Sequence, residues 1–223
     1  AMFLWGAESN YSTFTMNGGE ISGNMAKSGG CGGAVHIDHG TGGKAAFIMK
    51  GGLLPGNKAT DENGIGSKLG GAIYLKAGGK IELSGSAVIA VQKDCNDIYL
   101  GISTESVQQK ITITGTLAPG NNDAAGNQKY TARITPEEYA VEKEFFQSDS
   151  YTITSDDYEI KYVNNIYGDT NGKGSVIVVA KEGSNFVGDS KNVVKDYVND
   201  SEIKGYADKV DFKIGNLKFD GTN

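Results

Sequence analysis

Residues 47–57 read FIMKGGLLPGN, and the order of apolar, glycine and asparagine positions in this stretch recurs along the chain. Residues 14–24 read FTMNGGEISGN, the same pattern 33 positions earlier, and residues 111–121 read ITITGTLAPGN, 64 positions later. A degenerate copy, IELSGSAVIAV, occupies residues 81–91. Recurrence at this spacing is typical of stacked repeats, in which each copy is one structural unit that packs on the next.

A second motif alternates with the first. GGAVHI at 32–37 matches GGAIYL at 70–75 and, more loosely, NDIYLG at 96–101. Both motifs contain short runs of β-forming residues bounded by Gly, Asn or Ser, without a helical period. These runs are too short and too rich in glycine for hairpins, so the sequence predicts a mainly β fold. Its simplest form is a right-handed parallel β-helix of about three to four coils, with like strands above like strands.

The repeat ends after residue 121. We therefore assign residues 1–128 to the β-helix and residues 129–223 to a C-terminal cap with a small appended β-rich or α+β module, since an open β-helix end exposes strand edges. Further expected elements are an inserted loop at 59–68, strands at 150–153, 158–163 and 175–180, a helical turn or edge strand at 141–146, a helix-like pattern within 189–209, and a hairpin or final strand at 211–219.

The same alignment predicts two vertical columns of like residues. Cys31, Leu69 and Cys95 each precede a copy of the second motif, which places the cysteines two coils apart, roughly 9–10 Å. A disulfide needs Cα atoms within about 7 Å, so we expect two buried thiols. The second column holds Asn24, Asn57 and Asn121, which close successive copies of the first motif. These are either a hydrogen-bonded asparagine ladder or ordinary turn residues.

Composition narrows the class of partner. Glycine makes up 33 of 223 residues, about twice the usual share, which indicates many tight turns. A net charge of −6 and a single arginine, Arg133, argue against nucleic acid, because phosphate binding needs clustered Lys and Arg. No apolar run reaches the about 18–20 residues of a membrane helix. We expect an extracellular or cell-surface protein whose export signal or anchor lies outside residues 1–223.

The motifs resemble the repeats of polymorphic outer-membrane-protein-type bacterial surface proteins, which carry GGA-[ILV] and F-x-x-N. GGAVHI and GGAIYL match the first motif, Phe14–Asn17 matches the second, and Phe47–Lys50 departs from it at the last position. The resemblance covers about residues 10–121. It implies a parallel β-helix, display on the cell surface, and a role in adhesion or antigenic variation.

Chemistry-bearing residues are few. His36, Asp38 and His39 would supply three ligands to a metal, but a structural zinc site takes four, and we interpret them as surface residues. Acidic pairs such as Asp61–Glu62 and Asp156–Asp157 lie in expected loops with no His or Arg beside them. The sequence therefore assigns no catalytic residue, no cofactor and no metal ligand.

One candidate binding surface follows from the second motif. His36, Tyr74 and Tyr99 occupy the same outward position in its three copies. An exposed stripe of this kind offers a flat surface on which sugars stack. The other interpretation is a cross-strand aromatic ladder that only stabilises the sheet, and it is the one that we favour.

Two functions are compatible with these observations. The first is a non-catalytic bacterial cell-surface or secreted protein, an adhesin or stalk segment that presents loops to a host or bacterial surface protein or glycan. The alternative is a polysaccharide-binding or polysaccharide-degrading β-helix protein. The partner and the oligomeric state are not determined by the sequence.

Overall fold

The chain forms β-strands and no helix within the residues that the structure describes, so the predicted mainly β class is confirmed. The computed structural model describes residues 1–7, 11–28, 30–40, 42–60, 69–89, 97–102, 109–117, 130–137, 143–144, 146–148, 158–163, 175–180, 212–214 and 217–218. In these residues, no helix has the length and apolar character that crossing a membrane requires.

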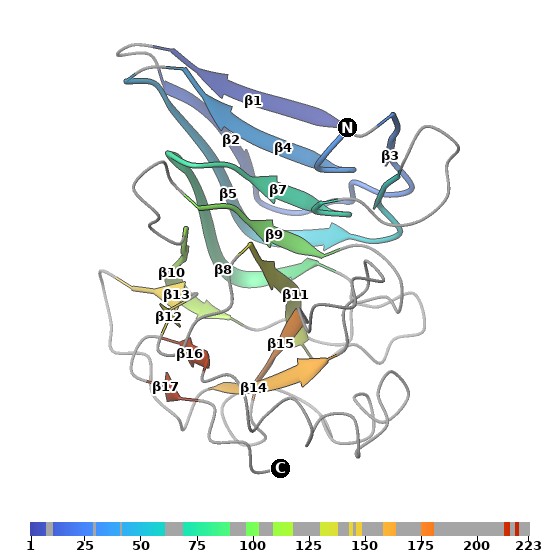
Figure 1. The fold of residues 1–223 in the computed structure, drawn as a ribbon. Coiled ribbons are helices and arrows are strands. Elements are labelled where there is room, and N and C mark those ends of the chain that lie inside the picture. The colour runs from blue at the N-terminus through green and yellow to red at the C-terminus, as the bar shows by residue number, and fades with distance from the viewer. Residues whose placement is uncertain are drawn as a thin grey trace.

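The largest sheet has seven strands in the order β1-β4-β7-β9-β11-β15-β14. They are β1 (Met2–Gly6), β4 (Val35–His39), β7 (Ile73–Leu75), β9 (Ile98–Leu100), β11 (Tyr130–Pro136), β15 (Ser175–Ala180) and β14 (Tyr158–Val163). The pairs from β1 to β11 are parallel, whereas β15 pairs antiparallel with both β11 and β14. The parallel strands follow one another in chain order, as Figure 1 shows.

A second sheet has five strands in the order β13-β10-β8-β5-β2, all paired in parallel. They are β2 (Tyr11–Met16), β5 (Lys44–Leu54), β8 (Gly79–Ile89), β10 (Ile111–Leu117) and β13 (Phe146–Gln147). The remaining strands are β3 (Met25–Ala26) paired with β6 (Lys58–Ala59), and a three-stranded sheet of β12 (Lys143–Glu144), β16 (Phe212–Ile214) and β17 (Leu217–Lys218).

The core lies between the two large sheets, because every second residue of their strands points inward. On the seven-stranded sheet, the inward positions hold Leu4, Ile37, Leu75 and Leu100, which are paired in that order. On the five-stranded sheet, they hold Phe14, Phe47, Ile81 and Ile111 in one column and Met16, Met49, Leu83 and Ile113 in the next. All of these side chains belong to or pack against one apolar cluster.

These columns show that the sequence repeat is also the spatial repeat. Phe14 pairs with Phe47, and their rings stack with centroids 6.0 Å apart and planes 2° from parallel. Phe47 in turn pairs with Ile81, and Ile81 with Ile111. Each copy of the first motif therefore lies directly beside the next, as the alignment predicts.

The degenerate copy at 81–91 departs from this register after its third residue. Met49 pairs with Leu83, but Gly51 pairs with Ser86, so β8 carries one extra residue. Gly85 lies at this β-bulge with φ 58°, a left-handed conformation that glycine adopts without strain. On the partner strand β5, the glycine-rich segment opposite this bulge continues as strand to Leu54. Gly52 is left-handed with φ 99°, and the register with β8 shifts between Met49 and Gly51, so β5 bends where the repeat indicates a corner although its strand continues. Figure 1 shows β5 and β8 as long curved strands.

The GGA motif has a steric explanation. Its first glycine is left-handed in both copies, with φ 71° at Gly32 and 68° at Gly70. Its second glycine meets the neighbouring backbone, since a Cβ on Gly33 would lie 2.2 Å from the carbonyl oxygen of Gly71. The alanine, Ala34 in the first copy, is fully buried. Each position of the motif thus admits only a small residue.

The asparagine column is hydrogen-bonded where the structure describes it. The Oδ1 atom of Asn57 accepts hydrogen bonds from the backbone N–H and the Nδ2 amide of Asn24, at 3.0 and 3.1 Å. Asn57 also donates from Nδ2 to the carbonyl oxygen of Ile21, at 2.8 Å, and its side chain is fully buried. Asn121 lies outside the described residues. Between the first two copies, these asparagines form a ladder rather than separate turns.

The cysteine column is only partly as expected. The backbone N–H of Gly32 donates to the carbonyl oxygen of Leu69, which places Cys31 and Leu69 on adjacent rungs. Cys31 is a thiol, but it and Leu69 are partly exposed, so the expectation of a buried thiol is wrong for Cys31. The reason is position: both residues precede the left-handed glycine that opens the motif, outside the inward face of the sheet. Cys95 lies outside the described residues.

The further elements that the sequence predicts can be compared with the structure where it describes them. β14 and β15 occupy residues 158–163 and 175–180, and β16 and β17 form the predicted hairpin. The stretch 141–146 contributes parts of β12 and β13, an edge-strand rather than a helical assignment. Ala59, expected as the first residue of the inserted loop, is instead buried in β6, and residues 61–68 lie outside the described residues. The expected strand at 150–153 and the helix-like pattern within 189–209 lie outside the described residues.

Replacing Asn57 by alanine is expected to lower the free energy of unfolding by about 2–3 kcal/mol, because the backbone N–H of Asn24 and the carbonyl oxygen of Ile21 on the neighbouring rung lose their hydrogen bonds to its buried side chain. Urea unfolding followed by circular dichroism measures this loss. Asn17→Ala is the matched control: Asn17 is an exposed residue in the first copy, and its loss should cost less than about 0.5 kcal/mol. Equal effects of the two substitutions would contradict a structural role for the ladder.

Candidate functional site

An aromatic stack crosses the outer face of the seven-stranded sheet. His36 on β4 pairs with Tyr74 on β7, and Tyr74 pairs with Tyr99 on β9. Their ring centroids are 4.9 Å and 5.5 Å apart, and the two tyrosine rings lie within 14° of parallel. The structure therefore brings together the three residues of the predicted stripe. Because successive residues of a strand alternate between faces, the apolar neighbours of these rings point into the core.

The stack contains a fourth ring that the sequence analysis missed. Phe3 on β1 pairs with His36, and their ring centroids lie 5.0 Å apart in an edge-to-face arrangement. The sequence could have indicated this residue, because the 33-residue shift between two copies of the first motif also separates Phe3 from His36. We refer to Phe3, His36, Tyr74 and Tyr99 as the aromatic stack.

Exposure decreases along the aromatic stack. Phe3 is 62% exposed, His36 and Tyr74 are half-buried, and Tyr99 is only 7% exposed. The prediction of an outward stripe that is exposed throughout is therefore wrong at Tyr99. Tyr99 lies between Tyr74 of β7 and Thr135 of β11 in the outward column. Only the end near Phe3 offers ring surface to a ligand.

Burial also sets the protonation of the two phenols. Burial raises the pKa of Tyr99 far above its ordinary value, and the negative charge of Glu137 adds to the effect. The pKa of Tyr74 is raised for the same first reason, with contributions from Cys31, Glu137 and Asp38. Both phenols are therefore neutral at physiological pH and supply hydroxyl groups rather than charges.

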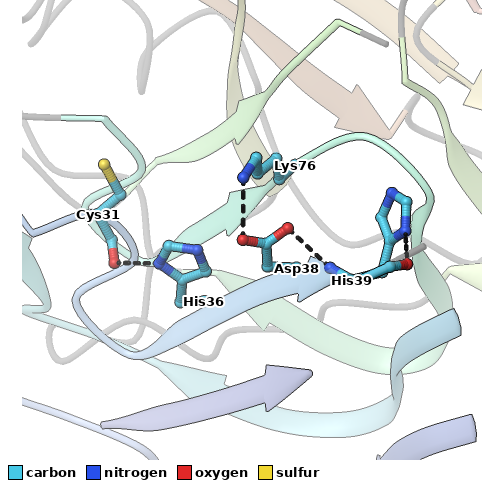
Figure 2. A network of polar contacts seen from close by, with 6 residues as sticks. Cys31, His36, Asp38, His39 and Lys76 are labelled. Atoms are coloured by element: carbon cyan, nitrogen blue, oxygen red, sulfur yellow. Dashed lines mark hydrogen bonds and ion pairs between the residues drawn. The ribbon is translucent and has the colours of Figure 1, made fainter. Parts of the chain in front are cut away.

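His36 is fixed by a hydrogen bond within its own rung. Its Nδ1 atom lies 3.1 Å from the carbonyl oxygen of Cys31, and because a carbonyl oxygen only accepts, Nδ1 carries the proton (Figure 2). The Nε2 atom is buried, and no hydrogen-bond partner for it lies among the described residues. The ring itself packs between those of Phe3 and Tyr74.

Asp38 and His39 form a second polar group on the same strand. Asp38 accepts the backbone N–H of His39 at 2.7 Å and pairs with the ammonium group of Lys76 at 3.1 Å, as Figure 2 shows. The ring of His39 donates from Nδ1 to the carbonyl oxygen of Gly40 at 2.7 Å. The carboxylate and both imidazoles are thus engaged in local contacts.

The His36, Asp38 and His39 side chains do not converge on a common point. In the described part of the chain, no group of three or more His, Cys, Asp or Glu side chains is arranged to hold a metal ion. What the surface offers chemically is aromatic ring area, neutral hydroxyls and one lysine–aspartate pair. Such a surface can bind by stacking and hydrogen bonding.

Comparison with known proteins does not assign the chain to a family. No protein-family model matches the chain, and neither a curated protein nor a solved structure matches it significantly.

The raised pKa of Tyr99 predicts a dependence of stability on alkaline pH. Above the ordinary tyrosine pKa of 10.0, the unfolded chain loses the phenol proton while the folded chain keeps it. The free energy of unfolding should therefore be unaffected by Tyr99 below this pH. It should fall above it by about 1 kcal/mol per pH unit until the folded-state pKa is reached.

Tyr99→Phe removes this contribution, so the variant should lose stability less steeply than the parent chain between about pH 10 and about pH 12. Urea unfolding at a series of pH values measures the two slopes. Equal slopes would show that the Tyr99 phenol is not held protonated by the fold.

Proposed function

We propose that the chain is a segment of a non-catalytic bacterial cell-surface or secreted protein, an adhesin or stalk in which a rigid stack of repeats presents loops to a partner. The observation that carries the proposal is the strict register of the repeat. The pairing of Phe14 with Phe47, of Phe47 with Ile81 and of Ile81 with Ile111 places each copy of the motif beside the next and so builds a continuous scaffold.

The architecture that we propose for this scaffold is a right-handed parallel β-helix of about three to four coils. The chain passes from the seven-stranded to the five-stranded and then to the two-stranded sheet in β1, β2 and β3, and repeats the order in β4, β5 and β6. β7 and β8, and then β9 and β10, repeat its first two steps. Parallel crossovers in one sheet are almost always right-handed, which supports the hand.

Residues 129–223 are proposed to cap this scaffold, with a small appended module. β11 still adds to the seven-stranded sheet in parallel, but β15 pairs antiparallel with β11, and β14 pairs antiparallel with β15. A switch to antiparallel pairing ends a parallel ladder and covers its last edge, which an exposed β-helix end requires. The division at residue 128 follows from the end of the sequence repeat.

Adhesion or support is favoured over catalysis by the state of the polar side chains. In the aromatic stack and beside it, His36, Asp38 and His39 are each held by a backbone or lysine contact. A general base needs hydrogen-bond reach to its substrate, and a nucleophile needs an adjacent base. The resemblance to polymorphic outer-membrane-protein-type repeats points in the same direction, toward surface display and a host or bacterial surface protein or glycan as partner.

The alternative is a polysaccharide-binding or polysaccharide-degrading protein, and one observation favours it. Three large apolar side chains are exposed in the described part of the chain, and two of them, Phe3 (62%) and Trp5 (51%), lie on the outer face of β1. Phe3 continues into the aromatic stack. Exposed aromatic rings next to hydroxyl groups are suited to sugar binding.

The two functions differ in a direct assay. The purified chain, coupled to beads, is tested for attachment to host cells and bacteria, and in parallel for turnover of neutral and acidic polysaccharides. We expect attachment without turnover. Replacing residues 61–68, which do not belong to the repeat, with a Gly-Ser segment of equal length should reduce attachment if this loop is presented to the partner.

Two results would decide against an adhesin. The first is cleavage of a polysaccharide that is abolished by mutating one pair of carboxylates, because it would establish an enzyme. The second is absence of attachment to every cell surface tested while the chain remains folded by circular dichroism.

A further inference from the structure

Asn17 and Gly18 form an exposed asparagine–glycine step directly after β2. Both residues follow the last pair of the β2–β5 ladder, which joins Met16 to Met49. The other copies of the first motif hold Lys50, Ser84 and Thr114 at the position of Asn17. The repeat therefore does not require an asparagine here, and its presence raises the question of what this residue does.

An asparagine that precedes glycine is chemically reactive without an enzyme. The backbone nitrogen of the glycine attacks the side-chain carbonyl carbon, Cγ, and the side-chain nitrogen leaves as ammonia while a succinimide ring closes. Water then opens the ring at one of its two carbonyl carbons, which yields aspartate or isoaspartate. Overall, one water is consumed and one ammonia is released. Glycine assists the ring closure because it has no Cβ to hinder the approach and restricts the backbone least.

The surroundings of Asn17 leave this reaction unobstructed. A Cβ built on Gly18 or on Gly19 would meet nothing within 4 Å. Within the described part of the chain, no hydrogen bond engages the backbone N–H of Gly18 or the side-chain amide of Asn17. The attacking nitrogen and the amide that it attacks are therefore both open to solvent.

The other two asparagines that the structure describes are held in place. Asn57 is fully buried, and its amide bonds to Asn24 and to the carbonyl oxygen of Ile21. The nitrogen that would attack it belongs to Lys58 and donates to the carbonyl oxygen of Asn24 at 2.9 Å. Asn24 has its amide in the same ladder and is followed by Met25, which has a side chain.

We propose that Asn17 is a site of spontaneous deamidation, at which the chain is converted to aspartate and isoaspartate forms, while the fold protects Asn24 and Asn57. The carrying observation is the contrast between an exposed, unbonded asparagine–glycine step and two asparagines fixed by hydrogen bonds. This inference is independent of the proposed function, because it concerns the covalent chemistry of the scaffold alone.

The two products should affect the fold differently. Aspartate at position 17 adds one negative charge to a chain of net charge −6. Isoaspartate also places the side-chain methylene in the main chain, which lengthens it just before a paired segment. In that segment, the backbone N–H of Leu53 donates to the carbonyl oxygen of Gly19 at 2.9 Å, and Ile21 donates to that of Leu53 at 3.0 Å. A longer backbone shifts these contacts, so the isoaspartate form should unfold at a lower urea concentration.

The test follows the whole chain during incubation at mildly alkaline pH, which promotes loss of the backbone proton. Peptide mapping by mass spectrometry measures the replacement of amide by carboxylate at each asparagine, and methylation by an isoaspartate methyltransferase measures the isoaspartate share. Asn17 should react at least about tenfold faster than Asn24 or Asn57, a difference of about 1.4 kcal/mol in activation free energy. Asn63–Gly64 and Asn171–Gly172 repeat the dipeptide outside the described residues, so each peptide is quantified separately.

Gly18→Ala is the decisive variant. It keeps Asn17 and the surrounding structure, since a Cβ at this position has open space and the backbone of Gly18 is not left-handed. The added methyl group hinders the attack, so deamidation at Asn17 should slow about tenfold. Asn17→Asp is the matched control for charge: it carries the negative charge without the longer backbone and should unfold at the same urea concentration as the parent chain.

Unfolding the chain in guanidinium tests the protective role of the fold, because Asn24 and Asn57 should then react faster than in the folded chain. The proposal would be overturned if folded Asn17 kept its amide as long as Asn24 and Asn57 did, or if Gly18→Ala reacted at the parent rate. Unchanged rates at Asn24 and Asn57 on unfolding would contradict their protection by the ladder.

Discussion

Parallel pairing in strict register is the constraint on which the rest of this structure depends. Because side chains alternate between the two faces of a strand, a slip by one residue would move Phe47 and Met49 from the core to the surface. The register is held by stacking like on like: Phe14 on Phe47, Met16 on Met49, and then Ile81 and Leu83. Each rung contacts chiefly its neighbours, so stability accumulates along one direction. A bulge at Gly85 absorbs the one extra residue of β8 relative to β5, and a second register shift lies between β8 and β10 after Ile113; neither disturbs the pairing of the apolar columns before it.

The same constraint organises the outer surface. If inward residues form columns, the residues between them must also form columns on the outside. On the seven-stranded sheet, the outward column is the aromatic stack, whose rings protect one another from water and leave Phe3 exposed at one end. On the five-stranded sheet, the outward positions differ from strand to strand in size and charge, and Ala46 leaves a hollow beside Lys80. Uniform columns therefore stabilise the scaffold, whereas uneven columns leave hollows on its surface.

Polar groups at the corners follow a related rule. A backbone that turns between sheets leaves N–H and C=O groups that the ladders do not use, and buried groups of this kind need partners. Asn57 serves two rungs at once through its contacts with Asn24 and Ile21. Asp97 links two copies of the second motif. Its buried carboxylate accepts the backbone N–H of Gly71, in the preceding copy, at 2.8 Å. These side chains hold the backbone between the sheets by hydrogen bonds, whereas the apolar columns hold the strands by packing.

The sequence by itself determined the repeat, the β class, the identity of the inward columns and the alignment of His36, Tyr74 and Tyr99. Like residues stack wherever one copy of the motif forms one rung, although the paired residues are 33, 34 and 30 positions apart in the sequence. Tertiary structure alone decided what covers each residue. It buried Tyr99 between β7 and β11, left Cys31 partly exposed, and continued β5 through Gly51 and Gly52. It also assembled the hollow on the five-stranded sheet from Thr13, Ala46, Lys80, Thr112 and Gln147. Thr13, Ala46 and Lys80 precede successive copies of the first motif, but their side chains differ in size and charge, so the hollow depends on neighbours from several strands rather than on the spacing within one.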